Sequence, residues 1–298
     1  MEAGAWTASP GAPVTTLLLL LLAIGLVPLA TGMVLLKPSA HGTRPSLCVG
    51  SLLLCALAFN LTFFWQELWL VIPKALTPGL HPILFHNNHD WTGDAPVAEL
   101  LQGSGAIATL ASGLAFCAGL VVARRGTVGW RLFLFWMAFE GLYQSLTQLA
   151  IGTLLPGNDV GRALAYLHLG SPARMMLLVL AVAAMAFAGG WLARFYPGAA
   201  ETGAAARTRP FGYAMLLLTM ASIVLIIPFR IPRDIVEVGL IPLFVNLVGV
   251  GWLILGAAVV RQDGRGLDQA RPGIAGPALA LGATLLLFQL VLRPGIPF

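Results

Sequence analysis

Long apolar segments alternate with short polar ones along almost the whole chain. Eight of these segments are long enough, and carry few enough charges, to cross a hydrocarbon core of about 30 Å as helices. They cover residues 15–36, 47–72, 104–123, 131–153, 175–194, 212–230, 236–260 and 274–292. The pattern predicts an all-α fold, a polytopic transmembrane helix bundle of about eight spans.

The fourth segment combines an apolar start with a polar stripe. Its polar residues recur every three or four positions, so on a helix they share one face. They are Glu140, Tyr143, Gln144, Thr147 and Gln148. A carboxylate in hydrocarbon costs on the order of a few kcal/mol, so Glu140 is expected to have a partner or a function. After a Pro-Gly-Asn-Asp turn at 156–159, residues 160–169 predict a short interfacial or re-entrant helix.

The second segment carries polar residues near its end. Asn60 and Glu67 are seven positions apart, which is two helical turns, so they share a face, and Gln66 precedes Glu67. These residues extend the polar chemistry to a second helix.

The connection 73–103 is long for a link between two spans, and long connections are often functional. It holds three of the five histidines, at positions 81, 86 and 89. His86 and His89 are three positions apart and Asp90 follows, a spacing that can bind zinc or another transition metal. The loop also carries Phe85, Trp91 and several leucines, which suits a surface that docks a partner.

Composition supports the membrane assignment. Of 298 residues, 58% are hydrophobic and only 10% are charged, and the mean hydropathy is +0.87. A soluble domain would carry about 25% charged residues. Basic runs with interleaved aromatics are absent, so no nucleic-acid partner is expected, and the lipid bilayer is the expected surroundings. The three cysteines lie in or beside apolar segments, which argues against a disulfide framework.

The distribution of Lys and Arg predicts the orientation. One set of connections holds eleven of the seventeen basic residues, Lys37, Arg44, Arg124, Arg125, Arg131, Arg194, Arg207, Arg209, Arg261, Arg265 and Arg271. The other set holds six, Lys74, Arg162, Arg174, Arg230, Arg233 and Arg293. The richer set is expected in the cytoplasm, which places both termini outside a bacterial-type inner membrane. The expected organisation is a flexible N-terminus (1–14), one transmembrane domain (15–293, including the external loop 73–103) and a tail (294–298).

This topology brings the polar places to one side of the membrane and predicts a buried, outward-facing polar site. The candidate catalytic residues are Glu67 and Glu140. The candidate metal ligands are His86, His89 and Asp159. The remaining polar residues of the expected site are Asn60, Gln66, Tyr143, Gln144, Gln148, Asn158, Arg162 and His168.

Each feature also has a purely structural interpretation. Glu140 fits a protonated acid hydrogen-bonded to a neighbouring helix, and the glutamine stripe fits contacts between helices. The loop histidines fit surface or capping residues, and His168 fits an interfacial one. Asp159 fits the N-cap of the short helix, with an ion pair to Arg162.

The order of these features resembles the site-2-protease-like integral-membrane zinc metallopeptidases. That family carries His-Glu-x-x-His on one membrane helix and an acidic ligand in a later turn. Here Gln66-Glu67-Leu68-Trp69-Leu70 matches the first motif and Gly157-Asn158-Asp159 the second. The resemblance implies zinc, a general base at Glu67 and a third ligand at Asp159. Gln66 and Leu70 replace both histidines, so the zinc pair is missing, and the family's site usually faces the cytoplasm.

Three functions remain open. If the site binds zinc or another metal, metal-activated hydrolysis, as in a peptidase, is the natural reaction. A transporter or conductor of protons, ions or small polar solutes would use Glu67, Glu140 and the glutamines as its path. An accessory subunit of a membrane complex would use loop 73–103 to contact its partner.

Overall fold

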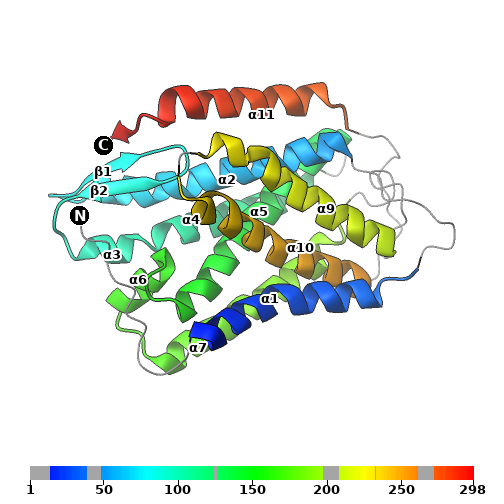
Figure 1. Cartoon of the computed structure of the whole chain (residues 1–298), viewed down its shortest axis with the longest axis horizontal. Coiled ribbons are helices and arrows are strands. Elements are labelled where there is room, and N and C mark those ends of the chain that lie inside the picture. Colours follow the sequence, from blue (N-terminus) through cyan, green and yellow to red (C-terminus); the bar gives the residue numbers. More distant parts are fainter. Residues whose placement is uncertain (1–13, 39–47, 124–125, 197–207, 232, 261–271) are drawn as a thin grey trace.

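Long helices run lengthwise through the molecule between two ends (Figure 1). The computed structural model describes residues 14–38, 48–123, 126–196, 208–231, 233–260 and 272–298. The long helices are α1 (Val14–Leu35), α2 (Val49–Ala75), α4 (Ser104–Val122), α5 (Val128–Leu154), α7 (Ser171–Leu192), α9 (Arg209–Ile226), α10 (Ile241–Val259) and α11 (Ala275–Leu287). Shorter helical segments are α3 (Val97–Leu101), α6 (Asp159–Tyr166), η1 (Ile227–Phe229), η2 (Val236–Leu240) and η3 (Phe288–Leu292).

Within the described residues, six helical stretches are long and apolar enough to cross a membrane, as expected of a membrane protein. They are Val49–Ala75, Val97–Val122, Ser171–Leu192, Arg209–Phe229, Val236–Val259 and Ala275–Leu292. Helix α1 is a further apolar helix, and α5 is as long as α2 but carries the polar stripe. The helical bundle is therefore confirmed, and the count of eight spans stays a prediction.

Helix α5 occupies the centre of the bundle, in contact with α2, α4, α7 and α10. Its residues from Phe135 to Thr147 are all buried, and Trp136, Phe135 and Phe139 are among the largest fully buried side chains. Gly113 of α4 meets the backbone of α5 at Gly141, where a Cβ on Gly141 would lie 2.6 Å from the Gly113 Cα. The polar stripe is therefore surrounded by protein on every side and does not face lipid.

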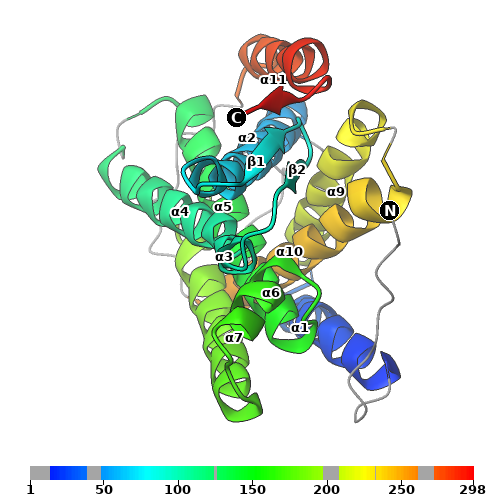
Figure 2. The ribbon, with the colours of Figure 1, turned by 90° about the vertical axis from the view of Figure 1, so that its left-hand side faces the viewer.

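A small antiparallel sheet covers one end of the bundle, and we call this the hairpin end (Figure 2). Its order is β2 (His89–Thr92), β1 (His81–Leu84) and β3 (Ile296–Pro297). Leu84 is paired with His89 on one side and with Ile296 on the other. The sequence indicated only helices, a loop over 73–103 and a tail over 294–298. The structure corrects this, because the tail supplies a strand to a sheet built from the loop.

The short helix after the fourth span is confirmed as α6, which packs against α5 and α3 at the hairpin end. Its N-cap is Asn158, whose side chain accepts a hydrogen bond from the Val160 amide at 3.0 Å. The interpretation of Asp159 as the N-cap is therefore wrong by one residue. Residues 1–13, most of the expected flexible N-terminus, lie outside the described residues.

Candidate functional site

A buried acid–imidazole pair lies at the hairpin end. Glu67, near the end of α2, places Oε2 2.7 Å from Nδ1 of His89 in β2, and both side chains are almost fully buried. The other ring nitrogen of His89, Nε2, lies 3.2 Å from Oε1 of Gln102. Lys74 Nζ, one helical turn beyond Leu70, lies 3.4 Å from the same oxygen and donates to the Leu70 carbonyl at 2.8 Å. Two predicted site residues, Glu67 and His89, thus meet. Their neighbours Gln102 and Lys74 were not predicted from the sequence.

The hydrogen bonds of this cluster determine how many protons it holds. An ammonium group only donates, so the Gln102 atom that faces Lys74 is the carbonyl oxygen. Since this oxygen also faces His89 Nε2, that nitrogen carries a hydrogen. The short contact between His89 Nδ1 and Glu67 then contains one further proton, either on the ring or on the carboxyl group. The Glu67–His89 pair is therefore a buried group that holds an exchangeable proton.

Asp159 belongs to the electrostatic surroundings of this pair. Burial and the Glu67 carboxyl raise the pKa of Asp159, and His89, Lys74 and Arg162 act in the opposite direction. Arg162 does not pair with Asp159. It makes two 2.6 Å contacts with the carboxylate of Glu99 on α3, which raises the pKa of the guanidinium, so the expected Asp159–Arg162 ion pair is wrong.

Two polar stripes face each other between α2 and α5. Near the hairpin end, Gln148 Nε2 donates to Gln66 Oε1 at 2.5 Å. Deeper in the bundle, Cys55 Sγ lies 3.8 Å from Oε1 of Glu140. These two contacts are separated by eleven residues on α2 and eight on α5, or about 12–17 Å at 1.5 Å per residue. The stripes therefore extend from the hairpin end to the middle of the bundle.

Glu140 is surrounded by polar groups from four helices. Gln144 Nε2 donates to Glu140 Oε2 at 3.0 Å, and Cys55 of α2 in turn accepts a hydrogen bond from Ser222 of α9 at 3.2 Å. Asn246 of α10 also acts on the carboxyl group. Glu140 is only 1% exposed, so these neighbours replace the solvation that the bundle removes.

Three side-chain atoms along the stripes have no hydrogen-bond partner within the described part of the chain. They are Thr62 Oγ1 of α2 and Gln144 Oε1 and Thr147 Oγ1 of α5, and Asn246 Oδ1 of α10 is a fourth such atom. Each of these residues is at most 3% exposed. Buried polar atoms in proteins are almost always satisfied, commonly by ordered water. The three atoms of the stripes lie between the level of Glu140 and that of the Gln66–Gln148 contact, where ordered water would join them, and we call this part of the two stripes the polar track.

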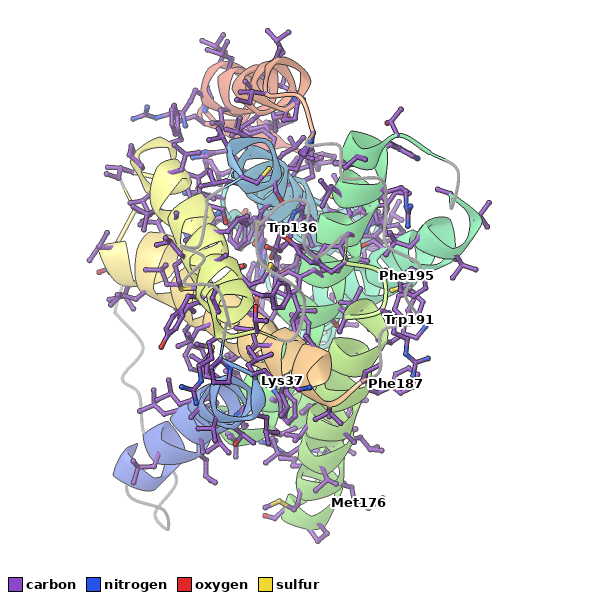
Figure 3. The ribbon with its side chains drawn as sticks, turned by 90° about the vertical axis from the view of Figure 1, so that its right-hand side faces the viewer. Lys37, Trp136, Met176, Phe187, Trp191 and Phe195 are labelled. Atoms are coloured by element: carbon purple, nitrogen blue, oxygen red, sulfur yellow. The ribbon has the colours of Figure 1, made fainter. Side chains whose placement is uncertain are left out.

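The track is closed toward the opposite end. Four residues before Glu140, Trp136 is fully buried, donates to Ser51 at 3.0 Å, and packs edge-on against Phe135 and Phe139. Figure 3, viewed from the opposite end, shows Trp136 near the centre of the bundle. A bulky aromatic side chain thus lies one helical turn from Glu140, on the side away from the hairpin end.

The two histidines proposed as metal ligands lie in different surroundings. His89 uses both ring nitrogens for Glu67 and Gln102. The imidazole of His86 is buried among arginines, and burial lowers its pKa to about 4. No group of three or more His, Cys, Asp or Glu side chains in the described ranges is arranged to hold a metal ion. The metal ligands therefore stay a prediction, and we derive no step through a metal.

Three residues of the expected site do not join it. Asn60 Nδ2 donates back to the Ala56 carbonyl at 2.8 Å. Tyr143 turns toward α7, where its hydroxyl donates to the Met185 carbonyl at 3.1 Å. His168 is exposed at the end of α6, with a φ of 52°.

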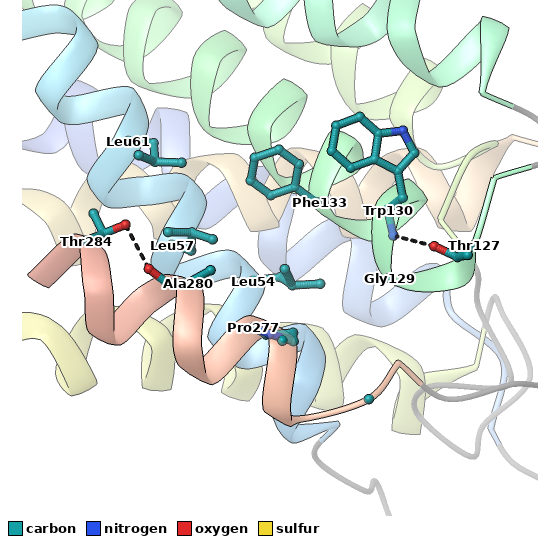
Figure 4. Close-up of a pocket in the computed structure, with 12 residues that line it drawn as sticks. Leu54, Leu57, Leu61, Thr127, Gly129, Trp130, Phe133, Pro277, Ala280 and Thr284 are labelled. Atoms are coloured by element: carbon teal, nitrogen blue, oxygen red, sulfur yellow. Dashed lines mark hydrogen bonds between the residues drawn. The ribbon is translucent and has the colours of Figure 1, made fainter.

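An apolar cavity lies apart from the polar track. It occupies about 670 Å³ between α11, α2 and the start of α5. Figure 4 shows Pro277 of α11 on one side and Phe133 and Trp130 on the other. Its lining is mainly apolar, so it offers no group for chemistry.

Sequence reasoning missed several residues of the track and the cluster. Cys55 and Thr62 were missed, although with the predicted Gln66 they follow the spacing i, i+7, i+11, which places all three on one face of α2. Lys74 and Gln102 are single polar residues at helix ends, and nothing in the local pattern connects them. Ser222 and Asn246 are isolated in apolar helices.

Comparisons with known proteins identify no relative. No protein family model matches the chain, and no curated protein or solved structure is detectably similar to it.

Proposed function

We propose that this membrane protein transfers protons between its outer surface and Glu140 in the middle of the bundle, as part of proton-linked transport. The observation that carries the proposal is the pair of facing stripes on α2 and α5, which hold three unpartnered buried polar atoms between the level of Glu140 and that of the Gln66–Gln148 contact. Such atoms can hold a chain of water molecules, and a chain of water molecules conducts protons. The Glu67–His89 pair supplies a proton-holding group near the outer end of this chain.

The orientation is part of this proposal. The hairpin end carries the six basic residues of the poorer set, so it faces outward across a bacterial-type inner membrane. A proton enters beside Glu67 and His89, passes the glutamines and threonines, and converts the Glu140 carboxylate to the carboxylic acid. Because Trp136 closes the inner side, release of the proton inward requires a second arrangement of the helices.

Proton flux into proteoliposomes loaded with a pH-sensitive dye tests the proposal. Under an imposed membrane potential, the wild-type protein should acidify the vesicles, and Glu140→Gln should slow acidification by about tenfold or more, because the amide cannot take up a proton. Asp94→Asn is the matched control, since it also changes an acid to its amide, but at an exposed position of the hairpin end. Equal rates for wild type and Glu140→Gln would refute the pathway.

Infrared difference spectroscopy gives a measurement that needs no transported solute. On transfer to heavy water, a carboxylic acid band that shifts by deuteration should be present in the wild type and missing in Glu140→Gln. Gln66→Leu should slow the shift, because it removes the hydrogen-bonded contact with Gln148. A band that never exchanges would show that Glu140 is sealed from water on both sides.

A further inference from the structure

A second cavity, lined mostly by polar side chains, opens at the hairpin end, apart from the polar track. It has a volume of about 230 Å³ and is lined by Phe85, His86, Asn87, Arg233 and Arg293. Phe85, His86 and Asn87 belong to the turn between β1 and β2. Arg233 lies after η1, and Arg293 directly follows η3. Elements far apart in sequence thus place two guanidinium groups at one cavity.

A third arginine lies behind the cavity. Arg230 is only 4% exposed, and its guanidinium lies 4.3 Å from the centre of the Phe63 ring. Burial lowers the pKa of Arg230 to about 10, partly offset by Glu67, so the group remains charged at neutral pH. Its Nε has no hydrogen-bond partner within the described ranges. A buried cation with an unused donor is expensive unless an anion accompanies it.

The His86 ring points to the same chemistry. It is 7% exposed, and neither ring nitrogen makes a well-formed hydrogen bond with the described residues. The Phe229 carbonyl acts on the ring, and it also accepts a hydrogen bond from Gln289. The charged groups that act on the ring are Arg230, Arg293 and Arg233.

Nearby carboxylates do not balance the positive charges of the arginines that line the cavity. Glu237 pairs with Arg233 at 3.0 Å, and both side chains are largely exposed. Asp234 accepts a hydrogen bond from the Val236 amide at 2.7 Å. Arg293 donates only to the neutral Gln289, at 3.0 Å. Two guanidinium groups therefore line one cavity, and of these two only Arg233 has a carboxylate partner among the described residues. Guanidinium groups bind phosphate through paired hydrogen bonds.

The surroundings of the cavity are apolar and exposed. They include Phe229, Ile231, Ile235, Leu290 and Val291, each between 41% and 74% exposed. These side chains follow directly on α9 and α11, two of the apolar helices that are long enough to cross a membrane. Arginines beside exposed apolar side chains are typical of protein surfaces that lie at the headgroup level of a bilayer.

We propose that the cavity lined by His86, Arg233 and Arg293, with the charge of Arg230 acting on it from nearby, binds a phosphate group, carried by a membrane phospholipid or present as a free anion. The guanidinium groups of Arg233 and Arg293 hold the phosphate oxygens at the mouth, and Arg230 supplies charge from behind. His86 donates to an oxygen once the anion favours its protonation.

Native mass spectrometry of the full chain in detergent tests this proposal. Phosphatidylglycerol should bind, and diacylglycerol, which has the same chains without phosphate, should not. The double variant Arg233→Gln/Arg293→Gln should weaken phosphatidylglycerol binding by about tenfold or more, because it removes two charge-assisted contacts. Arg174→Gln, which changes an arginine at the start of α7, should bind as the wild type does.

Competition with inorganic phosphate separates the two sources. If phosphate binds alone and displaces phosphatidylglycerol from the wild type, the ligand is a free anion. If phosphatidylglycerol resists displacement, the ligand is a lipid headgroup. The proposal is overturned if the double variant binds both probes as tightly as the wild type, or if the wild type binds neither. Both arginines are exposed, so a thermal unfolding scan of the double variant should match that of the wild type.

Discussion

At the scale of single residues, surroundings decide what each side chain does. His86 and His89 are three positions apart and looked alike in the sequence. His89 lies in β2 between a carboxyl group and an amide oxygen, which stabilise hydrogens on its ring. His86 lies in the turn, buried beside cations, which favour the neutral ring. The same contrast separates Gln66 and Gln148, which bind each other, from Asn60, which binds its own helix.

The His86 ring makes stability depend on pH. In the folded protein its pKa is about 4, whereas the value in an unfolded chain is 6.5. As the pH falls between these values, the unfolded chain takes up a proton before the folded one does, so stability declines, by up to about 1.4 kcal/mol per pH unit. At pH values above 6.5 the ring is neutral in both states, so His86 does not change the stability there.

Thermal unfolding of the anion-free protein in detergent, at pH about 7.5 and about 5, measures this. The unfolding temperature of the wild type should fall more between the two pH values than that of His86→Asn, which has no ring to titrate. An equal fall for both proteins would mean that His86 is protonated in the folded state.

At the scale of elements, α5 presents a different chemistry on each side. Toward α2 and α10 it places Glu140 and the glutamines, and toward α7 it places Tyr143. Toward α4 it places Gly141, which lets the two backbones touch at Gly113. Such close contacts between small residues replace the hydrophobic driving force that lipid removes.

Gly141→Ala should therefore force α4 and α5 apart. The new Cβ would meet backbone atoms of Gly113 at 2.6–2.7 Å, which cannot move aside as a side chain can. We expect a loss of about 1–3 kcal/mol, seen as a lower unfolding temperature in detergent. Gly129→Ala is the control on the same helix, because nothing lies within 4 Å of its added Cβ. Equal stability of the two variants would show that the helix contact is looser than described.

At the scale of the whole molecule, the two ends of the bundle differ. The hairpin end is covered by a sheet and by α3 and α6, which bury the Glu67–His89 pair (Figures 1 and 2). The connections rich in Lys and Arg belong to the opposite end, and many of their basic residues lie outside the described ranges. The positive-inside rule therefore predicts that the hairpin end faces outward and the opposite end faces the cytoplasm.

Thiol labelling in intact cells tests that direction. In a background with Cys48, Cys55 and Cys117 changed to Ala, Asp90→Cys at the hairpin should react with a membrane-impermeant maleimide. Gly126→Cys, at the opposite end, should react only after the membrane is opened. The reverse pattern would invert the predicted topology and place the entrance of the proton track in the cytoplasm.

The sequence by itself determined the membrane helices, the short helix α6 and the polar face of α5. Hydropathy and periodicity are local properties, and each of these features depends on residues a few positions apart. The same locality explains the errors at the C-terminus, where no nearby pattern shows that Ile296 pairs with Leu84.

Only the tertiary structure decided which polar groups meet. Cys55 and Glu140 are 85 positions apart, and Ser222 and Cys55 are 167 positions apart. Their contact depends on how α2, α5 and α9 pack, and packing is fixed by small residues and aromatic shapes along whole helices. For the same reason the residues of the predicted single site are found in three places: the buried Glu67–His89 pair at the hairpin end, the polar stripes that lead to Glu140, and the cavity lined by His86 and two arginines.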